Sequence, residues 1–480
     1  MDIINTINDW LWTYLMIAVL LGAALYFTIY TGGVQFRMLP QMIKLLFTSS
    51  KAHEDPLYPK PKKKTISSFQ AFTVSLASHV GTGNIAGVAI AIAVGGPGAV
   101  FWMWIVAIIG AANAFIESTL AQIFKVPDKN SFRGGPAYYI QKGTGQRWWA
   151  IIFAVLISLT FGLSYNSVQI NTIAISLNDT FGLQPIWVGV FTTVVALIII
   201  YGGIQRISKV SEIVVPIMAV CYLLLALFII ITHISQFPSI IKLIIENAFG
   251  VGPIVGGGIG SAILLGVKRG LFSNEAGEGS TPNAAATADV THPVKQGLIQ
   301  SLGVYTDTLL ICSATAFIIL CSGAFQTSLT GVELTQYALQ SEIGNIAKIF
   351  ISIAVLMFAF TSIIGNYYYS ETNLKFIYNS RALIWIFRIV MAALMIIASV
   401  ATLDIIWALA DIAMGLMTLC NITAILILGR FSIKALRDYN KQRKQGKDPL
   451  FTWRVIPELK DEIESSWPDE VKNVEVQETI

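Results

Sequence analysis

The sequence predicts an all-α polytopic membrane protein with about eleven transmembrane helices. Of its 480 residues, 55% are hydrophobic and only 12% are charged, whereas soluble domains carry about 25% charged residues. Apolar runs of about 18 residues or more, the length of a membrane-spanning helix, recur along almost the whole chain. Transmembrane β-barrels would show short alternating segments, and none are visible. We therefore expect a helical bundle in a lipid bilayer.

Apolar runs mark the expected spans, and basic residues orient them. The spans are expected near 12–33, 68–94, 98–124, 149–177, 185–203, 213–235, 254–282, 297–323, 346–370, 383–400 and 405–429. Lys and Arg concentrate after the first, third, fifth, seventh, ninth and eleventh spans, and Lys242 is the clear exception. Basic connections remain on the cytoplasmic side of a membrane. We expect a multi-pass protein of the plasma (inner) membrane, with its N-terminus outside and its C-terminus in the cytoplasm.

Two regions are expected to lie outside the bundle. Residues 1–66 hold the first span, which has no basic region of a signal peptide before it, and a segment at 35–47 in which apolar and basic residues alternate. That segment is expected to lie along the inner membrane surface. Residues 430–480 mix charge and proline with little periodicity, which predicts a solvated cytoplasmic tail without chemistry of its own.

The second and seventh spans both contain glycine and polar residues at membrane depth. The stretches are SLASHVGTGNIAGVAIAIAVGG and RGLFSNEAGEGSTP. Irregular backbone survives in a membrane only where it lines a cavity or is buried in protein. The freed N–H groups suit a carboxylate, and the freed carbonyl groups suit a small cation. The alternative is close helix packing, which we prefer for GVAIAIAVGG alone. For GTGN and FSNEAGEGS together, we favour a binding role.

The positions of the two breaks predict an inverted repeat. If the first span is peripheral, residues 67–235 and 236–429 form two sets of five spans, and each set begins with an interrupted helix. Because five is odd, the two sets have opposite orientations, as in inverted-repeat transporters. This repeat is inferred from hydropathy and position alone.

Two long stretches carry a resemblance to a known family. SHVGTGNIAGVAIAIAVGGPGAVFWMW and VKRGLFSNEAGEGSTPNAAATADVTHPVKQGL resemble the alanine/glycine:cation symporter family, and the resemblance extends from the first span to about residue 430. It implies a leucine-transporter-type 5+5 inverted repeat with one extra N-terminal helix. It also implies a sodium-coupled symporter that imports small neutral amino acids, alanine and glycine, by alternating access.

The resemblance also implies a substrate site. Its expected members are His79, Thr82, Gly83, Gly162, Gln169, Phe272, Ser273 and Asn274. The N–H groups of Thr82 and Gly83 would meet the substrate carboxylate. Carbonyl groups near His79, Phe272 and Ser273, with the Asn274 side chain, would accept from the ammonium. Phe272 would also cap the pocket. Gly162 and Gln169 are seven positions apart, which places them on one helical face; an interhelical hydrogen bond is an equally good interpretation of Gln169.

A sodium site is expected beside the first break. Na⁺ prefers oxygen ligands, and Thr361 and Ser362 are adjacent hydroxyl residues in the ninth span. By the resemblance they would join carbonyl groups of Ala77, Val80 and Phe358. The alternative is that both hydroxyls bond back within their own helix. The neighbouring break favours the ion site.

Other ionisable residues near membrane depth are candidates for function by default. Glu275 and Glu278 are expected to neutralise Lys268 and Arg269 near the transport pathway. His79 is expected to be packed or hydrogen-bonded instead of carrying protons. The remaining acidic residues are expected close to span ends: Glu117, Asp307, Asp404 and Asp411.

Other function classes fit less well. The four histidines form no HExxH motif, no Cys/His cluster is present and no GxSxG motif occurs, so we expect no enzyme. We also expect no organic cofactor and no nucleic-acid partner, with Na⁺ as the co-transported ion. A proton-coupled amino acid carrier, or a uniporter or channel for small zwitterions, remains the alternative. The sequence does not indicate an oligomeric state.

Overall fold

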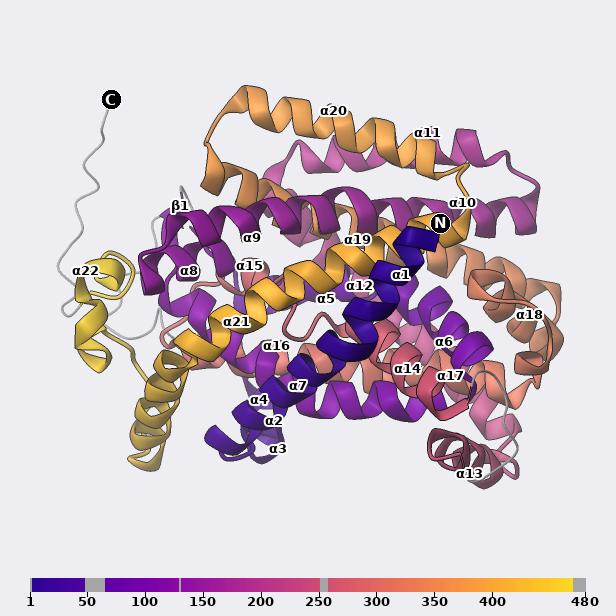
Figure 1. Ribbon diagram of the computed structural model, residues 1–480, viewed down its shortest axis with the longest axis horizontal. Helices are drawn as coiled ribbons and strands as arrows, with labels where there is room; N and C mark the ends of the chain where they lie inside the picture. Colours follow the sequence, from indigo (N-terminus) through magenta and orange to yellow (C-terminus); the bar gives the residue numbers. More distant parts are fainter. Residues whose placement is uncertain (1, 48–64, 129–130, 251–257, 469–480) are drawn as a thin grey trace.

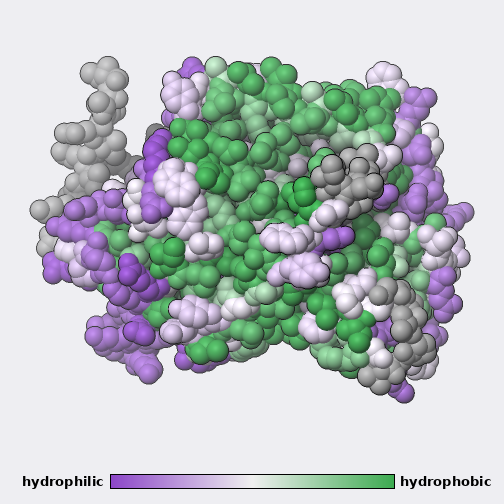
Figure 2. Space-filling view, viewed as in Figure 1, coloured by the Kyte–Doolittle hydropathy of each residue, from purple (hydrophilic) through white to green (hydrophobic). Residues whose placement is uncertain are grey.

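The computed structural model describes residues 2–47, 65–128, 131–250 and 258–468, and these residues are mostly helical (Figure 1). Their one sheet is a hairpin in which β1 (Val126–Asp128) pairs antiparallel with β2 (Ser131–Arg133). Figure 2 shows a broad hydrophobic surface across the middle of the molecule, with hydrophilic residues gathered toward the two ends. This distribution is expected for a bundle that crosses a bilayer.

Helix bounds follow the chain in order. The first half contains α1 (Asp2–Trp10), η1 (Leu11–Met16), α2 (Ile17–Tyr30), α3 (Val34–Arg37), α4 (Leu39–Phe47), α5 (Ser68–His79), η3 (Gly83–Gly87), α6 (Val88–Gly95), α7 (Gly98–Ile123), α8 (Pro136–Thr144), α9 (Arg147–Leu159), η4 (Thr160–Tyr165), α10 (Asn166–Phe181), α11 (Pro185–Ile200) and α12 (Gly203–Thr232). The second half contains α13 (Phe237–Ala248), α14 (Gly258–Asn274), α15 (Thr281–Ala285), α16 (Pro293–Tyr305), η5 (Thr306–Cys312), α17 (Ser313–Cys321), η6 (Ala324–Gln326), α18 (Gly331–Ile343), α19 (Asn345–Ile377), α20 (Arg381–Ala398), α21 (Leu403–Lys444), η7 (Trp453–Val455), η8 (Pro457–Leu459) and α22 (Lys460–Ile463).

These helices account for the predicted spans. Among the described residues, eight helices are long and apolar enough to cross a membrane, and the bent pair α5 and η3–α6 makes a ninth. The two other predicted spans correspond to shorter helices, α11 with 16 residues and α14 with 17 residues. The predicted start of the seventh span, at residue 254, lies outside the described residues.

Both expected interruptions are present. A capping box between Ser67 and Gln70 begins α5, and the span bends by 48° where α5 gives way to η3 and α6. In the other interrupted span, α14 ends at Asn274 and is followed by an irregular turn before α15. Gly277 and Gly279 in that turn have φ values of 95° and 85°, which side chains other than glycine rarely allow.

The C-terminal region differs from the predicted solvated tail. Helix α21 continues to Lys444, and the chain then folds back until residue 468, burying Phe451, Ile456, Ile463 and Trp467. The indole of Trp467 donates to the Gln122 carbonyl oxygen at 3.0 Å, and the Phe451 N–H donates to the Thr291 carbonyl oxygen at 2.9 Å. The prediction was wrong because widely spaced apolar residues in a charged segment have no helical period, yet they pack well on an existing surface. Residues 469–480 lie outside the described residues.

Connections separate into two ends of the bundle (Figure 1). The hairpin, α8 and α22 lie at the left end of the view, where the basic connections are. Two helices that were not predicted, α13 and α18, lie at the right end. The two interrupted spans cross the interior between these ends, where α5, η3 and α14 pack on one another and on α7 and α16.

Candidate functional site

Side-chain oxygens accept from the N–H groups freed at the first break. The Gly81 N–H donates to Asn84 Oδ1 at 2.9 Å, and the Thr82 N–H donates to Gln169 Oε1 at 3.0 Å. Thr82 Oγ1 and His79 Nδ1 are buried and have no hydrogen-bond partner. Buried polar atoms are rarely left without a partner, so polar groups at this break are suited to receive a polar ligand.

Close backbone approach explains the glycines of the first break. A Cβ atom on Gly81 would lie 2.9 Å from Gln169 Oε1 and closer still to Ser362 Oγ. A Cβ atom on Gly83 would lie 3.0 Å from the Phe272 ring. The two broken spans therefore meet through Gly83 and Phe272, while Gly81 lies against α10 and α19.

An aromatic wall stands beside this contact. The Phe272 ring centroid lies 4.4 Å from that of Tyr165 and 4.6 Å from that of Trp407. Phe272 is 4% exposed, so these rings and Gly83 enclose it. A substrate side chain that reached this wall would meet rigid rings, which limit its size.

Ser273 and Asn274 direct their side chains toward η5. Ser273 Oγ donates to Asp307 Oδ2 at 2.7 Å, and Asn274 Nδ2 donates to Thr308 Oγ1 at 3.2 Å. In the other direction, His79 Nε2 lies 2.8 Å from Thr281 Oγ1. His79 is thus buried and hydrogen-bonded, as predicted.

Gly162 lies apart from the first break. It belongs to the π-helical segment η4, and a Cβ atom on it would contact Phe387 of α20 and Ser370 of α19. Because a π-helical turn holds more residues than an α-helical turn, seven positions no longer bring Gly162 onto the face of Gln169. The structure therefore brings Thr82, Gly83, Gln169 and Phe272 together and places Gly162 elsewhere.

Ser362 lies among the expected sodium-site carbonyl groups. Its Oγ atom is 2.9 Å from the Ala77 carbonyl oxygen, 3.3 Å from that of Val80 and 3.0 Å from that of Phe358. Thr361 Oγ1 is 2.9 Å from the Phe358 carbonyl oxygen. The bond back to Phe358 therefore coexists with the contacts across to α5. One hydroxyl hydrogen serves only one of three carbonyl oxygens at a time, so this pocket of oxygens has an excess of negative potential that suits a small cation.

The basic residues before the second break have a different partner from the predicted one. Lys268 Nζ lies 3.5 Å from Asp411 Oδ2, and the Arg269 guanidinium forms an ion pair with the same carboxylate. All three side chains are buried. Glu275 and Glu278 therefore do not neutralise Lys268 and Arg269, and Asp411 does so from another span.

Acidic side chains hold the second break in place. Glu117 accepts from the N–H groups of Gly277 and Gly279, each at 3.1 Å. Glu275 accepts from Ser78 Oγ at 2.7 Å and from Ser280 Oγ. Tyr165 Oη donates to Glu278 Oε1 at 3.2 Å.

The expectation that Glu117, Asp307 and Asp411 lie at span ends was wrong. Glu117 and Asp307 are fully buried and Asp411 is 4% exposed, whereas Asp404 is exposed in the first turn of α21. Glu117 and Asp307 each interrupt an apolar run far from basic residues, and this is the signal in the sequence that could have identified them.

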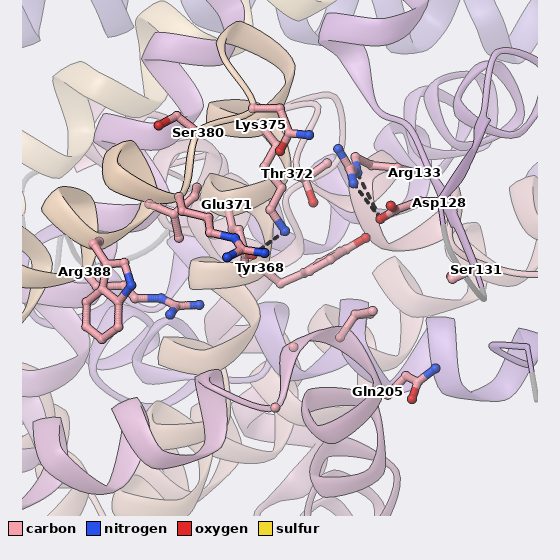
Figure 3. Close-up of a pocket in the computed structure, with 17 residues that line it drawn as sticks. Asp128, Ser131, Arg133, Gln205, Tyr368, Glu371, Thr372, Lys375, Ser380 and Arg388 are labelled. Atoms are coloured by element: carbon pink, nitrogen blue, oxygen red, sulfur yellow. Dashed lines mark hydrogen bonds and ion pairs between the residues drawn. The ribbon is translucent and has the colours of Figure 1, made fainter. Parts of the chain in front are cut away.

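A pocket of about 650 Å³ opens at the end of the bundle that carries the basic connections (Figure 3). Its lining includes Arg133 paired with Asp128 at 2.7 Å and Lys375 paired with Glu371 at 2.5 Å. None of the predicted substrate or sodium residues lines it. It nevertheless follows α19, the helix that carries Ser362, out of the bundle.

Comparison with known proteins shows extensive similarity. Residues 1–453 match the family model described as "Sodium:alanine symporter family". The chain is 50% identical to the probable sodium/glutamine symporter GlnT of Bacillus subtilis (strain 168), over 95% of this chain and 94% of that protein. It is 34% identical to the sodium/alanine symporter AgcS of Methanococcus maripaludis, over 92% of this chain and 98% of that protein.

Solved structures show a related fold. The crystal structure of MhsT in complex with L-phenylalanine has a TM-score of 0.56 at 14% identity, covering 85% of this chain and 94% of MhsT. A mutant of the Eremococcus coleocola manganese transporter has a TM-score of 0.54 at 14% identity over the same shares. At such low identity, these likenesses concern the arrangement of the helices alone.

Proposed function

Because the chain belongs to the sodium:alanine symporter family and is therefore a cation-coupled amino acid symporter, we propose that a sodium gradient drives its import of small neutral amino acids, alanine and glycine. The match to the family model covers both interrupted spans and nearly all of the chain. The observation that supports sodium coupling most directly is the convergence of three carbonyl oxygens on Ser362 Oγ.

The amino acid binds at the first break in this proposal. Its carboxylate accepts from the N–H groups of Thr82 and Gly83, and Gln169 turns away from Thr82 to make room. Carbonyl groups near His79, Phe272 and Ser273 accept from the ammonium group. Phe272, supported by Tyr165 and Trp407, limits the side chain to a small one.

Na⁺ binds between α5 and α19. Its ligands are the carbonyl oxygens of Ala77, Val80 and Phe358 and the hydroxyls of Thr361 and Ser362. Val80 is also the residue at which α5 ends. An ion that fixes this carbonyl group therefore fixes the backbone next to the amino acid, which links the two binding events.

Transport proceeds by alternating access between residues 67–235 and 236–429, which form the two halves of an inverted repeat. Residues 1–66 and 430–480 lie outside this core. The basic connections place the pocket between Arg133 and Lys375 on the cytoplasmic side, with the N-terminus outside. The pocket then serves as the route by which substrate leaves toward the cytoplasm.

Glutamine is the second candidate substrate. The supporting observation is the 50% identity to a protein described as a probable sodium/glutamine symporter. Glutamine requires room beyond the Cβ atom, so its transport demands that the rings of Phe272 and Trp407 move apart.

Uptake into proteoliposomes tests the proposal. Labelled alanine, glycine and glutamine are supplied with and without an inward Na⁺ gradient, at matched membrane potential. We expect alanine and glycine to accumulate above equilibrium and to be released by a sodium ionophore. Preferred accumulation of glutamine would change the substrate but keep the coupling. Uptake that only equilibrates, or that follows a proton gradient without Na⁺, would contradict sodium symport.

A further inference from the structure

Asp307 is a fully buried carboxylate that none of the sites above uses. It lies in η5, between the two broken spans, and no Lys, Arg or His side chain of the described residues forms an ion pair with it. The ion pairs in this part of the bundle belong to Asp411. An ionisable side chain inside a membrane protein is costly unless it is compensated, and such residues mark ion pathways.

Oxygen-bearing side chains from both breaks surround this carboxylate. Asn84 Nδ2 donates to Asp307 Oδ1 at 2.5 Å, Ser273 Oγ donates to Oδ2 at 2.7 Å, and Thr308 Oγ1 lies 2.9 Å from Oδ2. Asn84 follows the first break, and Ser273 precedes the second. We call Asn84, Ser273, Asp307 and Thr308 the Asp307 cluster. All four side chains are buried.

The chemistry of this cluster suits a hard monovalent cation. It offers a carboxylate, two hydroxyls and one amide, and oxygen ligands favour hard cations over transition metals. Among the described residues, no group of three or more His, Cys, Asp or Glu side chains is placed to hold a metal ion. A single carboxylate balances a single positive charge. We propose that the Asp307 cluster binds a second sodium ion, separate from the one at Ser362.

The two ion sites lie on different sides of the first break. Ser362 contacts carbonyl groups of Ala77 and Val80, which precede it. The Asp307 cluster reaches Asn84, which follows it. This inference rests on the proposed function, because a second coupling ion has meaning only in a sodium-driven carrier.

Asn84 links the second ion to the amino acid. Its Oδ1 atom accepts from the Gly81 N–H at 2.9 Å, while its Nδ2 atom donates to Asp307. An ion at Asp307 favours rotation of the amide so that its oxygen faces the ion. The rotation frees the Gly81 N–H, next to the N–H of Thr82 that meets the substrate carboxylate. Ion binding and amino acid binding therefore strengthen each other.

The coupling ratio of the unmodified protein tests this proposal first. In proteoliposomes, the membrane potential at which net alanine flux reverses, at known Na⁺ and alanine gradients, gives the number of ions moved with each amino acid. We expect two sodium ions per alanine. One sodium ion per alanine would overturn the second site without affecting sodium symport, and it needs no variant that folds.

Asp307→Asn tests the residue itself. We expect the coupling ratio to fall by one ion and the Na⁺ concentration for half-maximal uptake to rise by about tenfold or more, since one carboxylate contact is worth at least about 1.4 kcal/mol. Asp404→Asn, at an exposed carboxyl in α21, is the matched control and is expected to leave both quantities unchanged. Ser362→Ala is expected to impair the other site.

Three results would overturn the inference. Asp307→Asn could lower the rate of uptake while keeping the ratio and the Na⁺ dependence, which is a structural role. It could raise only the alanine KM, which identifies a partner of the substrate ammonium. The second charge of the unmodified protein could be accompanied by internal acidification instead of sodium entry, which identifies a proton. If the unmodified protein shows no sodium-driven uptake at all, the proposed function fails first.

Discussion

At the scale of single residues, Ser362 concentrates the argument for sodium coupling. Its hydroxyl faces three carbonyl oxygens within 3.3 Å, two of them from a helix that ends there. Backbone carbonyl groups of α5 reach this point only because Gly81 permits α19 and α10 to approach so closely. A larger residue at position 81 would separate the ion ligands from one another.

Ser362→Ala is expected to raise the Na⁺ concentration for half-maximal alanine uptake by about tenfold, because it removes one ligand to a charged group. Proteoliposome uptake at varied Na⁺ measures this. Ser158→Ala is the matched control, since Ser158 is also a buried serine, bonded only to the carbonyl group four residues earlier. An unchanged Na⁺ dependence in Ser362→Ala would remove Ser362 from the ion site.

Phe272→Ala is expected to broaden side-chain selection. Removal of the ring opens space between Gly83, Tyr165 and Trp407, so leucine and glutamine uptake should rise relative to alanine uptake by about tenfold, the effect of about 1.4 kcal/mol. Competition against labelled alanine measures the change. Phe191→Ala, on the exposed face of α11, is the control. Identical preferences in the variant and the unmodified protein would argue against a limiting role for this ring.

At the scale of elements, each broken helix depends on side chains from its neighbours. The second break has no internal hydrogen-bond ladder, and Glu117 of α7 accepts from two of its N–H groups and from Asn421 Nδ2. A buried donor that loses its acceptor costs about 1–3 kcal/mol. The shape of the break is therefore stored in α7 as much as in the glycines.

Glu117→Leu should lower the stability of the protein by at least about 2 kcal/mol, because it leaves the N–H groups of Gly277 and Gly279 without acceptors. Thermal unfolding in detergent measures this, and Glu117→Gln, which keeps one acceptor oxygen, should fall between the two. Glu333→Leu, at an exposed position of α18, is the control. If both leucine variants unfold at the same temperature, Glu117 does not hold the break.

The sequence predicted the positions of the helices better than their contacts. Apolar length located the spans, and glycine with polar residues located both breaks, because these are local properties of the chain. The partner of Lys268 and Arg269 could not be predicted, since Asp411 lies in another span far along the sequence. Gly162 could not be placed either, because the π-helical turn η4 changes the face on which it lies.

At the scale of the whole molecule, an apolar belt lies between two polar ends (Figure 2). The end with the basic connections is covered by the C-terminal region, which packs against residues near Gln122 and Thr291. His292 lies at this junction. Its ring centroid is 5.2 Å from that of Phe451, and its Nε2 atom is 3.4 Å from Asp438 Oδ2.

Acidification is expected to loosen the C-terminal region. Burial lowers the pKa of His292 below 6.5, and the hydrogen bond with Asp438 opposes this shift without overcoming it. The docked state therefore binds the proton less well than the undocked state. Stability is complete above about pH 6.5 and is lost as pH falls toward the lowered pKa, by at most about 1.4 kcal/mol per pH unit.

Hydrogen exchange of residues 450–467, corrected for the pH dependence of intrinsic exchange, measures this effect between about pH 7.5 and 5. His292→Gln should remove most of the pH dependence. A variant with the same pH dependence as the unmodified protein would assign the effect to another group.

The buried triad of Lys268, Arg269 and Asp411 bears on the order in which the protein is assembled during synthesis. Helix α14 carries two cations, and each charge at the centre of an unaccompanied helix disfavours insertion by about 2.5–3.5 kcal/mol. Their counter-charge is on α21 and is translated only after the intervening helices. Until then, α14 has to wait at the translocon or at the membrane surface. The second half of the bundle is thus completed by its last helix, and a ribosome that stops before Asp411 releases a chain that the membrane does not retain in folded form.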